Sequence, residues 1–191
     1  MSTYLDMGIP DVGSGILQPK LKNRWRVTFA NLGGGTDSTP VSMQAINISR
    51  PKLSFQEVEL HRYNSRAWIG SKHNWEPMSL TLEDDVTNTA TNVIQEQLQK
   101  QQWLIGAEGT WLATAATASA YKFTVYADLL DGNEAVLEKW TYEGCWITNC
   151  DWGELGYADG DAVTISLSMR YDHARQDISF NTSGMGTALG S

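Results

Sequence analysis

The sequence is poor in the residues that build most catalytic and metal sites. It holds only two cysteines, Cys145 and Cys150, and three histidines, His61, His73 and His173. The cysteines lack CxxC spacing, and no histidine is spaced from another potential ligand as on a metal-binding helix, so we expect neither a metal site nor a cofactor. Two thiols in a strand-rich segment are most often buried small hydrophobes, with a disulfide or a metal site as the alternatives.

Positive charge and long apolar runs are also scarce. The 14 Lys and Arg residues against 22 Asp and Glu give a net charge of -8. A nucleic-acid grip needs clustered basic side chains, so this balance argues against DNA binding, although not against a surface that DNA slides past. No run approaches the roughly 20 apolar residues of a membrane helix, and the first residues lack the pattern of a signal peptide. A chain of 191 residues is expected to form one domain.

The rest of the chain is organised around residues 50–85. Alternating apolar residues lead into a polar tip, and a second alternating run leads out of it. The two runs are Leu53, Phe55, Val58 and Leu60, and Trp75, Met78, Leu80 and Leu82. This pattern predicts a long hairpin arm. A lone two-stranded ribbon is marginally stable in water, so the arm is a first indication of self-assembly.

Elsewhere the sequence predicts one helix and further strands. Residues 86–105 carry apolar residues at helical spacing behind Asp84 and Asp85, which would cap the helix, and Gly106 would end it. We expect this helix to flank the sheet on its outer side. The predicted strands are 24–31, 41–49 with a bulge at Ala45–Ile46, 121–129, 135–142, 145–152 and 163–171.

Three stretches lie outside these elements. Residues 1–22 form an N-terminal arm, which is either a disordered leader or an arm that lies on a neighbouring subunit, because aliphatic residues stand between its glycines and prolines. Residues 106–120 are small and weakly patterned, which predicts an insertion loop. Residues 174–191 predict a flexible C-terminal tail. We therefore expect one β-domain over residues 23–173.

Three motifs, in this order, resemble the tail tube proteins of contractile-tailed bacteriophages. They are LKNRWRV at 21–27; RYNSR at 62–66 with KHNWEPMSLTL at 72–82; and YEGCWITN at 142–149 with GEL at 153–155 and the strand 163–171. The resemblance covers about residues 20–173. Secreted tube proteins of bacterial contractile injection systems look similar, and the sequence does not separate the two.

This resemblance implies a mostly β fold, a sandwich or barrel with one flanking helix. It further implies that six copies form a ring with a continuous inner β-barrel, and that rings stack into the tube through which the DNA genome passes. The implied partners are other copies of the chain, the tail sheath, the baseplate and the tape-measure protein. The implied location is the virion, after synthesis in the host cytoplasm, and the implied role is structural rather than enzymatic.

Two sets of residues are candidates for this role. For the lumen we expect residues opposite the apolar positions of their strands, which could equally be ordinary solvated strand faces: Glu57, Glu59, Glu83, Thr164, Ser166 and Ser168. For ring-to-ring contact we expect the arm tip, whose alternative is an ordinary mobile hairpin: Arg62, Tyr63, Asn64, Arg66 and Trp68. Exposed Trp and Arg at a tip more often mark an interface.

Two other classes of function compete with a tube. A carbohydrate-binding sandwich would use Trp68, Trp75 and Trp111 as stacking platforms, and it predicts a monomer that binds sugar. A hydrolase with a scattered site would use Glu83 and Asp84, and it predicts an activity that alanine substitution abolishes. The tube interpretation predicts rings or filaments instead.

Overall fold

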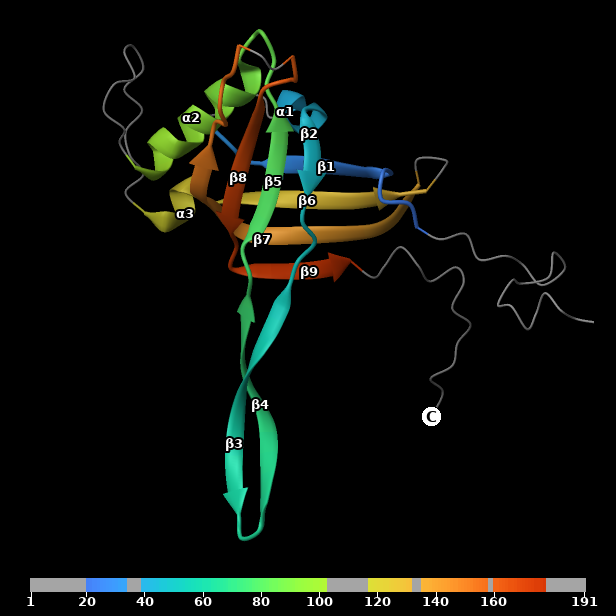
Figure 1. Ribbon diagram of the computed structural model, residues 1–191, viewed down its shortest axis with the longest axis vertical. Helices are drawn as coiled ribbons and strands as arrows, with labels where there is room; N and C mark the ends of the chain where they lie inside the picture. The colour runs from blue at the N-terminus through green and yellow to red at the C-terminus, as the bar shows by residue number, and fades with distance from the viewer. Residues whose placement is uncertain (1–19, 34–38, 103–116, 132–134, 158–159, 178–191) are drawn as a thin grey trace, which may run out of the picture.

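The computed structural model describes residues 20–33, 39–102, 117–131, 135–157 and 160–177 (Figure 1). Within these ranges the fold is mostly β, as predicted. In chain order the elements are β1 (Trp25–Ala30), α1 (Thr39–Met43), β2 (Ala45–Ile48), β3 (Leu53–Arg62), β4 (Ser65–Trp75), β5 (Met78–Glu83), α2 (Thr89–Gln101), α3 (Ala118–Tyr121), β6 (Phe123–Leu130), β7 (Val136–Asp151), β8 (Thr164–Arg170) and β9 (His173–Asp177).

The body is one bent sheet in which β7 belongs to two groups of strands. Its hydrogen-bonded path runs β1-β6-β7-β8-β5-β2, with β9 also paired to β7, while β3 and β4 form a separate two-stranded sheet. In Figure 1, β1, β6, β9 and the first part of β7 run across β2, β5 and β8. The two inner faces therefore pack on one core, as in an orthogonal sandwich. The end strands β1 and β2 are not paired with each other, so the described strands do not close a barrel.

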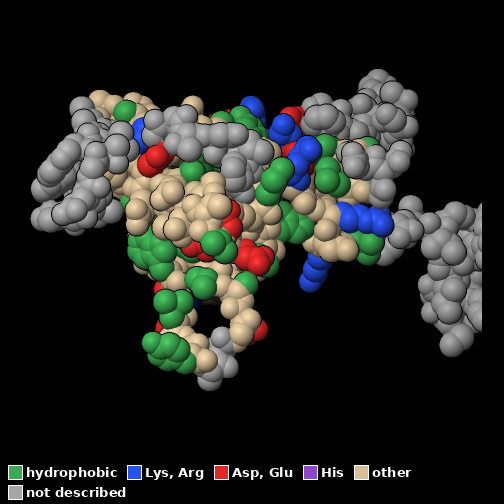
Figure 2. All heavy atoms as spheres, turned by 90° about the horizontal axis from the view of Figure 1, so that it is seen from above, with side chains coloured by type: hydrophobic (Ala, Val, Ile, Leu, Met, Phe, Trp, Pro, Cys, Tyr) green, Lys and Arg blue, Asp and Glu red, His purple; other side chains and the backbone are tan. Residues whose placement is uncertain are grey.

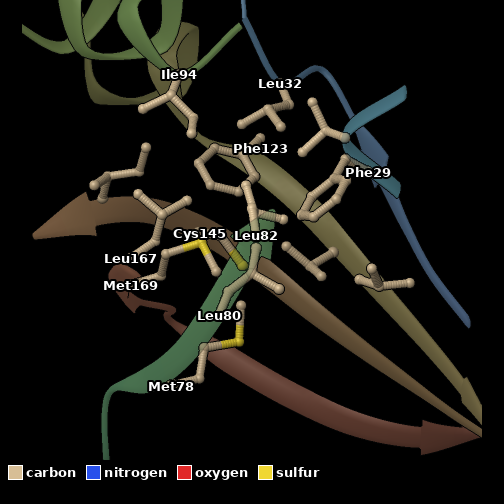
Figure 3. Close-up of a cluster of buried hydrophobic side chains, with 14 of the residues drawn as sticks. Phe29, Leu32, Met78, Leu80, Leu82, Ile94, Phe123, Cys145, Leu167 and Met169 are labelled. Carbon is tan, nitrogen blue, oxygen red and sulfur yellow. The ribbon is translucent and has the colours of Figure 1, made fainter. Parts of the chain in front are cut away.

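The core lies between these two groups of strands and under α2. In β5, Met78, Leu80 and Leu82 are buried, and in β8 the residues Ile165, Leu167 and Met169 are buried. Figure 3 shows side chains from both groups meeting around Phe123, with Ile94 of α2 above them. Burying each such side chain contributes about 1.5–3 kcal/mol, which makes the strict alternation of β5 and β8 a strong determinant of the fold.

Two predicted strand assignments differ from the structure. Residues 41–49, predicted as one strand, form α1 and the four-residue β2. Pro40 stands in the first turn of α1, where a missing N–H costs no helical hydrogen bond. The predicted bulge is confirmed as a register shift between Ala45 and Asn47. The strands predicted at 135–142 and 145–152 are one 16-residue strand, β7.

The bend in β7 is made at Gly144. This residue has a φ of 69°, a left-handed conformation that favours glycine, and the pairing with β6 shifts register between Val125 and Phe123. A Cβ at position 144 would lie 2.3 Å from a carboxylate oxygen of Asp172. The glycine that the sequence pattern marks as a break between strands is therefore a bulge within one strand.

The boundaries of the arm and the tail also change. The arm consists of β3 and β4, residues 53–75, and Glu76–Pro77 separate it from β5, which belongs to the body. Residues 173–177, most of them predicted to lie in the tail, form β9 beside β7. The sequence HARQD carries no apolar alternation that would reveal a strand. The predicted arm 1–22 and tail 174–191 otherwise lie almost entirely outside the described residues.

The predicted flanking helix is present as α2, but two short helices, α1 and α3, accompany it among the described residues. The backbone N–H of Thr89 donates to the Asp85 carboxylate at 2.9 Å, so Asp85 caps α2 as expected. This hydrogen bond is the main reason why the pKa of Asp85 lies below its ordinary value. The α-helix ends at Gln101, and the predicted end at Gly106 lies outside the described residues. Among the described helices, none has the length and apolarity needed to span a membrane.

Candidate assembly surfaces

One face of β5 and β8 carries small polar side chains almost throughout. The two strands pair antiparallel, and the pairs on this face are Ser79 with Ser168, Thr81 with Ser166, and Glu83 with Thr164. These side chains alternate with the buried core residues and are exposed or half-buried. The structure therefore brings four of the predicted lumen residues together: Glu83, Thr164, Ser166 and Ser168. We call this surface, with Ser79 and Thr81, the small-polar face.

The strands on either side extend this face with residues that the sequence prediction missed. Asn47 of β2 pairs with Thr81, and on β7 Asn149 pairs with Ser168 and Asp151 with Ser166. These three residues are exposed. Non-local pairing brings them there, and β2 is too short for its alternation to be read from the sequence.

The remaining predicted lumen residues, Glu57 and Glu59, lie elsewhere. Both belong to β3 in the arm, where Glu57 pairs with Gly70 and Glu59 with Trp68. A carboxylate oxygen of Glu59 lies 3.1 Å from Nε of Arg66. The structure thus separates these two glutamates from the small-polar face, because the body strand begins only after Pro77.

The small-polar face is bounded by two strand edges. Among the described residues, β2 pairs only with β5, and the last part of β7 pairs only with β8. At Ile147 this second edge is covered by Gln101 of α2, whose side chain accepts from the Ile147 N–H at 2.9 Å and donates to its carbonyl at 3.0 Å. Unpaired strand edges are templates for pairing with another chain. The described edges of the small-polar face left for such pairing are β2 and the end of β7 beyond Ile147.

The arm projects from the body (Figure 1), and it exposes apolar side chains on both faces. On one face Phe55 is 61% exposed, and on the other Val58 pairs with Ile69, which is 52% exposed. No described residue of the body covers the outer part of the ribbon, which contacts mainly itself. An isolated two-stranded ribbon with exposed apolar residues is marginal in water, so this element requires a partner for stability.

The predicted contact residues do gather at the tip of the arm. Tyr63 and Asn64 form the turn between β3 and β4, and Arg62 pairs with Ser65 across it. The Tyr63 side chain is fully exposed, and Trp68 is 60% exposed. Aromatic and arginine side chains are the usual centres of protein interfaces, and here they are held out at the far end of the molecule.

An aromatic cluster and an ion-pair network fix the base of the arm. The Trp75 ring lies 5.8 Å from that of Tyr171 and 5.9 Å from that of His173. Before β3, Arg50 bonds to Glu138 of β7, which also binds Lys20 at 2.6 Å. Burial raises the pKa of Glu138, but its bonds to Lys20, Trp140 and Arg50 outweigh this and lower the pKa overall. The arm is therefore oriented by the body rather than hinged freely.

The residues considered for catalysis have structural contacts. Asp84 accepts from the Thr91 hydroxyl at 2.8 Å, beside the capping Asp85. Within the described residues, no group of three or more His, Cys, Asp and Glu is placed to hold a metal. Both cysteines are free thiols, and burial raises the pKa of Cys145 to about 12 and that of Cys150 to about 11. Such thiols are poor nucleophiles at neutral pH.

Three known proteins show what the chain is similar to. A tail tube protein of Serratia phage KSP90 is 26% identical over 160 residues, which cover 82% of this chain and 88% of that protein. The tube-terminating cap of the anti-feeding prophage superposes with a TM-score of 0.64 at 12% identity, over 88% of this chain and 95% of that one. A chain in the extended sheath-tube complex of the extracellular contractile injection system PVC gives 0.61 at 12% identity, over 85% and 93%. No family model matches the sequence.

These matches agree with the resemblance read from the sequence motifs. The structural likenesses show the fold, since their identities are low. The curated relative carries the predicted name, tail tube protein, and comes from a phage. The predicted resemblance to tail tube proteins is therefore confirmed, and the matches support the interpretation of the chain as a structural tail tube subunit.

Proposed function

We propose that this protein is the repeating subunit of a phage tail tube, in which rings of copies stack into a hollow conduit for the DNA genome. The observation that carries the proposal is the small-polar face, which is bounded by two strand edges that can pair with neighbouring copies. The alternative is that the protein is a subunit of the inner tube of a bacterial contractile injection system. The phage relative, rather than the injection-system likenesses, reaches sequence similarity over most of both chains and favours the first.

Ring formation follows from the edges. Pairing β2 of one copy with the free end of β7 in the next would continue the same sheet from subunit to subunit. When this series closes, both edges of the small-polar face are paired and the small-polar faces form one continuous inner barrel. The number six comes from the family resemblance, and such a ring would carry a formal charge of 6 × (-8) = -48.

The small-polar face suits a lumen through which DNA slides. Its serine and threonine side chains project little and carry no charge, and Glu83 and Asp151 add negative charge. Arg170 lies near the end of β8 that leads to the aromatic cluster. An acidic subunit repels phosphate and should not retain the DNA that it conducts. Glu57 and Glu59 are excluded from the proposed lining because they lie in the arm.

Stacking of rings is assigned to the arm. Its tip residues Arg62, Tyr63, Asn64, Arg66 and Trp68 are held away from the body, where a second ring can contact them. A sheath contact is proposed for the outer surface, because one structural neighbour was solved in a sheath-tube complex. A baseplate contact is proposed as well, because the family resemblance implies that partner. Contact with a tape-measure protein, assembly after synthesis in the host cytoplasm, and the virion as the final location complete the proposal.

A structural rather than enzymatic role is part of the proposal. Glu83 and Asp84 are adjacent at the end of β5, and the Asp84 carboxylate already accepts a hydrogen bond from the Thr91 hydroxyl. The carbohydrate-binding alternative is disfavoured, since Trp75 packs edge-on against His173 and Trp68 lies at the far part of the arm. Trp111, the third predicted platform, lies outside the described residues.

Electron microscopy of the purified full-length protein, with its mass in solution measured alongside, tests this function. We expect rings or hollow filaments whose wall is one subunit thick. A protein that stays monomeric at every concentration, even after addition of tube fragments as seeds, contradicts the proposal. Saturable binding to a glycan array by such a monomer would then favour the carbohydrate-binding class.

A further inference from the structure

The end of the body opposite the arm is both acidic and apolar. We call this end the apex: residues 83–88, 151–157 and 160–163 (Figure 1, top). We propose that the apex is the receptor for the arm tip of a second copy of this chain. This inference rests on the proposed tube function, and it names the surface that the arm contacts in the next ring.

Two loops are held together to form the apex. The backbone N–H of Asp84 donates to the carbonyl of Val163 at 2.9 Å, which joins the loop after β5 to the loop before β8. Large apolar side chains point outward from both loops. Val86 and Tyr157 are fully exposed, and Leu155 is 84% exposed. Exposed apolar side chains gathered on one end of a protein mark a contact surface.

The same loops concentrate negative charge. Their carboxylates are Glu83, Asp84, Asp85, Asp151, Glu154 and Asp161, and these ranges contain no Lys or Arg. Within the described part of the chain, none of the six forms an ion pair. Figure 2 views the molecule from this end, with acidic side chains near the middle and hydrophobic ones beside them. A partner for this surface should therefore present cations together with apolar or aromatic groups.

The arm tip has this chemistry. Between His61 and Arg66 the tip carries two arginines and no acidic residue. In the described part of the chain Arg62 forms no ion pair, and Arg66 forms one only with Glu59. The exposed Tyr63 and Trp68 supply aromatic surface next to these cations. The tip is thus complementary to the apex in both charge and polarity.

The occupant must come from another copy. The arm and the apex stand at opposite ends of the longest axis of the molecule, so one chain cannot bring its own tip to its own apex (Figure 1). The two surfaces differ, which makes their contact head-to-tail. A head-to-tail contact leaves one free tip and one free apex after every addition, and it extends along an axis when its rotation does not close a ring.

Charge reversal on each surface tests this pairing in the full chain. One variant carries Arg62→Glu and Arg66→Glu, a second carries Glu154→Lys and Asp161→Lys, and a third combines all four changes. Glu143→Lys, which changes a half-buried acidic residue on β7 outside the apex, is the matched control. Filament formation is followed by electron microscopy and sedimentation, and folding of each variant is checked by its thermal unfolding curve.

We expect either double variant to raise the concentration needed for filaments by about tenfold or more, and the combined variant to restore most of the loss. The control should assemble as the unchanged protein does. Filaments of unchanged length from the apex variant would overturn the inference. So would failure of the combined variant to recover, since the two surfaces would then serve different partners.

A cysteine pair separates failure of this inference from failure of the tube function. Tyr63→Cys and Tyr157→Cys are placed in one chain and oxidised after assembly. We expect a ladder of covalent multimers on a non-reducing gel, because each copy links its tip to the apex of the next. Filaments without a ladder overturn the receptor assignment and leave the tube standing. Absence of rings and filaments from the unchanged protein overturns the tube itself.

Discussion

Side-chain amides of α2 form hydrogen bonds with backbone groups, in the way that a neighbouring strand would. Gln101 bonds both the N–H and the carbonyl of Ile147, as a peptide of a neighbouring strand would. The buried Gln97 accepts from the Gly33 N–H at 3.0 Å and donates to the Tyr121 carbonyl at 2.7 Å. A buried backbone N–H or C=O that has no hydrogen-bond partner lowers stability. These two glutamines supply such partners, so α2 can pack against a strand edge and a loop without leaving these groups unpaired.

Replacing Gln101 by alanine should therefore destabilise the monomer and uncover a longer edge of β7. Two net hydrogen bonds are lost, which predicts a fall of about 1–3 kcal/mol in the free energy of unfolding. Urea denaturation of the monomer measures this change. The control is Gln95→Ala, an exposed glutamine of the same helix, which should change stability by less than about 0.5 kcal/mol. Equal effects of the two substitutions would contradict the edge-covering role.

Glu138 makes stability depend on pH. Its carboxylate is buried among Lys20, Arg50 and Trp140, which hold its pKa below the ordinary value of 4.5. A lowered pKa in the folded state means that this contribution is present above pH 4.5 and is lost as the pH falls through the folded value. Glu138→Gln should thus cost only about 1–2 kcal/mol at pH 7, since both cations are exposed to solvent.

Below the folded pKa of Glu138 the same substitution should cost little, because the native carboxyl is then neutral as well. Unfolding midpoints in urea at pH 7 and at pH values below 4.5 give the comparison. Glu143→Gln removes only a half-buried carboxylate that lies 3.8 Å from Arg175, and it provides the control. A cost for Glu138→Gln that is the same at both pH values would exclude the ion-pair explanation.

At the scale of elements, substitutions in the arm should affect assembly far more than they affect folding of the monomer. Val58 and Ile69 form a cross-strand pair on one face of the ribbon and remain 44% and 52% exposed. Changing both to serine removes little buried area in the monomer, so its free energy of unfolding should shift by less than about 1 kcal/mol. The concentration needed for filaments should nevertheless rise, because the substitutions remove the apolar surface that the arm presents to its partner.

Sedimentation of the assembled fraction and thermal unfolding of the monomer are the two measurements. Leu80→Ser provides the opposite case, since Leu80 is buried in the core and its loss should unfold the protein before assembly is affected. If the Val58→Ser and Ile69→Ser chain assembled as readily as the unchanged one, the outer part of the arm would have no partner.

The elements that alternation or helical spacing specify were predictable. β5, β8 and the arm follow the period-two pattern, and α2 follows its apolar stripe after Asp85. The misassigned elements depend on non-local pairing. The sequence pattern at Gly144 predicts a break, but β6 pairs with β7 on both sides of this residue and keeps the strand continuous. The sequence of β9 has no apolar alternation, and this strand forms because it pairs with the edge of β7.

The same distinction applies to the candidate site. Ser166 and Ser168 could be placed on one face from β8 alone, and the arm tip could be located by its polar turn. Asn47 and Asn149 could not, because their place beside these residues depends on pairing between distant strands. Glu57 and Glu59 were grouped with Glu83 by alternation in one long predicted arm, which the structure divides at Pro77.

At the scale of the whole molecule, the proposed lumen predicts a tube that does not bind the DNA passing through it. Ser166 lies at the centre of the small-polar face, paired with Thr81 on one side and Asp151 on the other.

Ser166→Lys would add one positive charge per subunit to that wall. Assembled tubes of this variant should retain short single-stranded DNA, and the retention should weaken steeply as salt is raised, since phosphate contacts release counterions. Fluorescence anisotropy of a labelled oligonucleotide measures the binding. The unchanged tube should bind none at physiological salt, and Gln176→Lys, on the exposed strand β9, is the control for added charge elsewhere. If the β9 variant retained as much DNA as the Ser166 variant, the small-polar face would not be the inner wall.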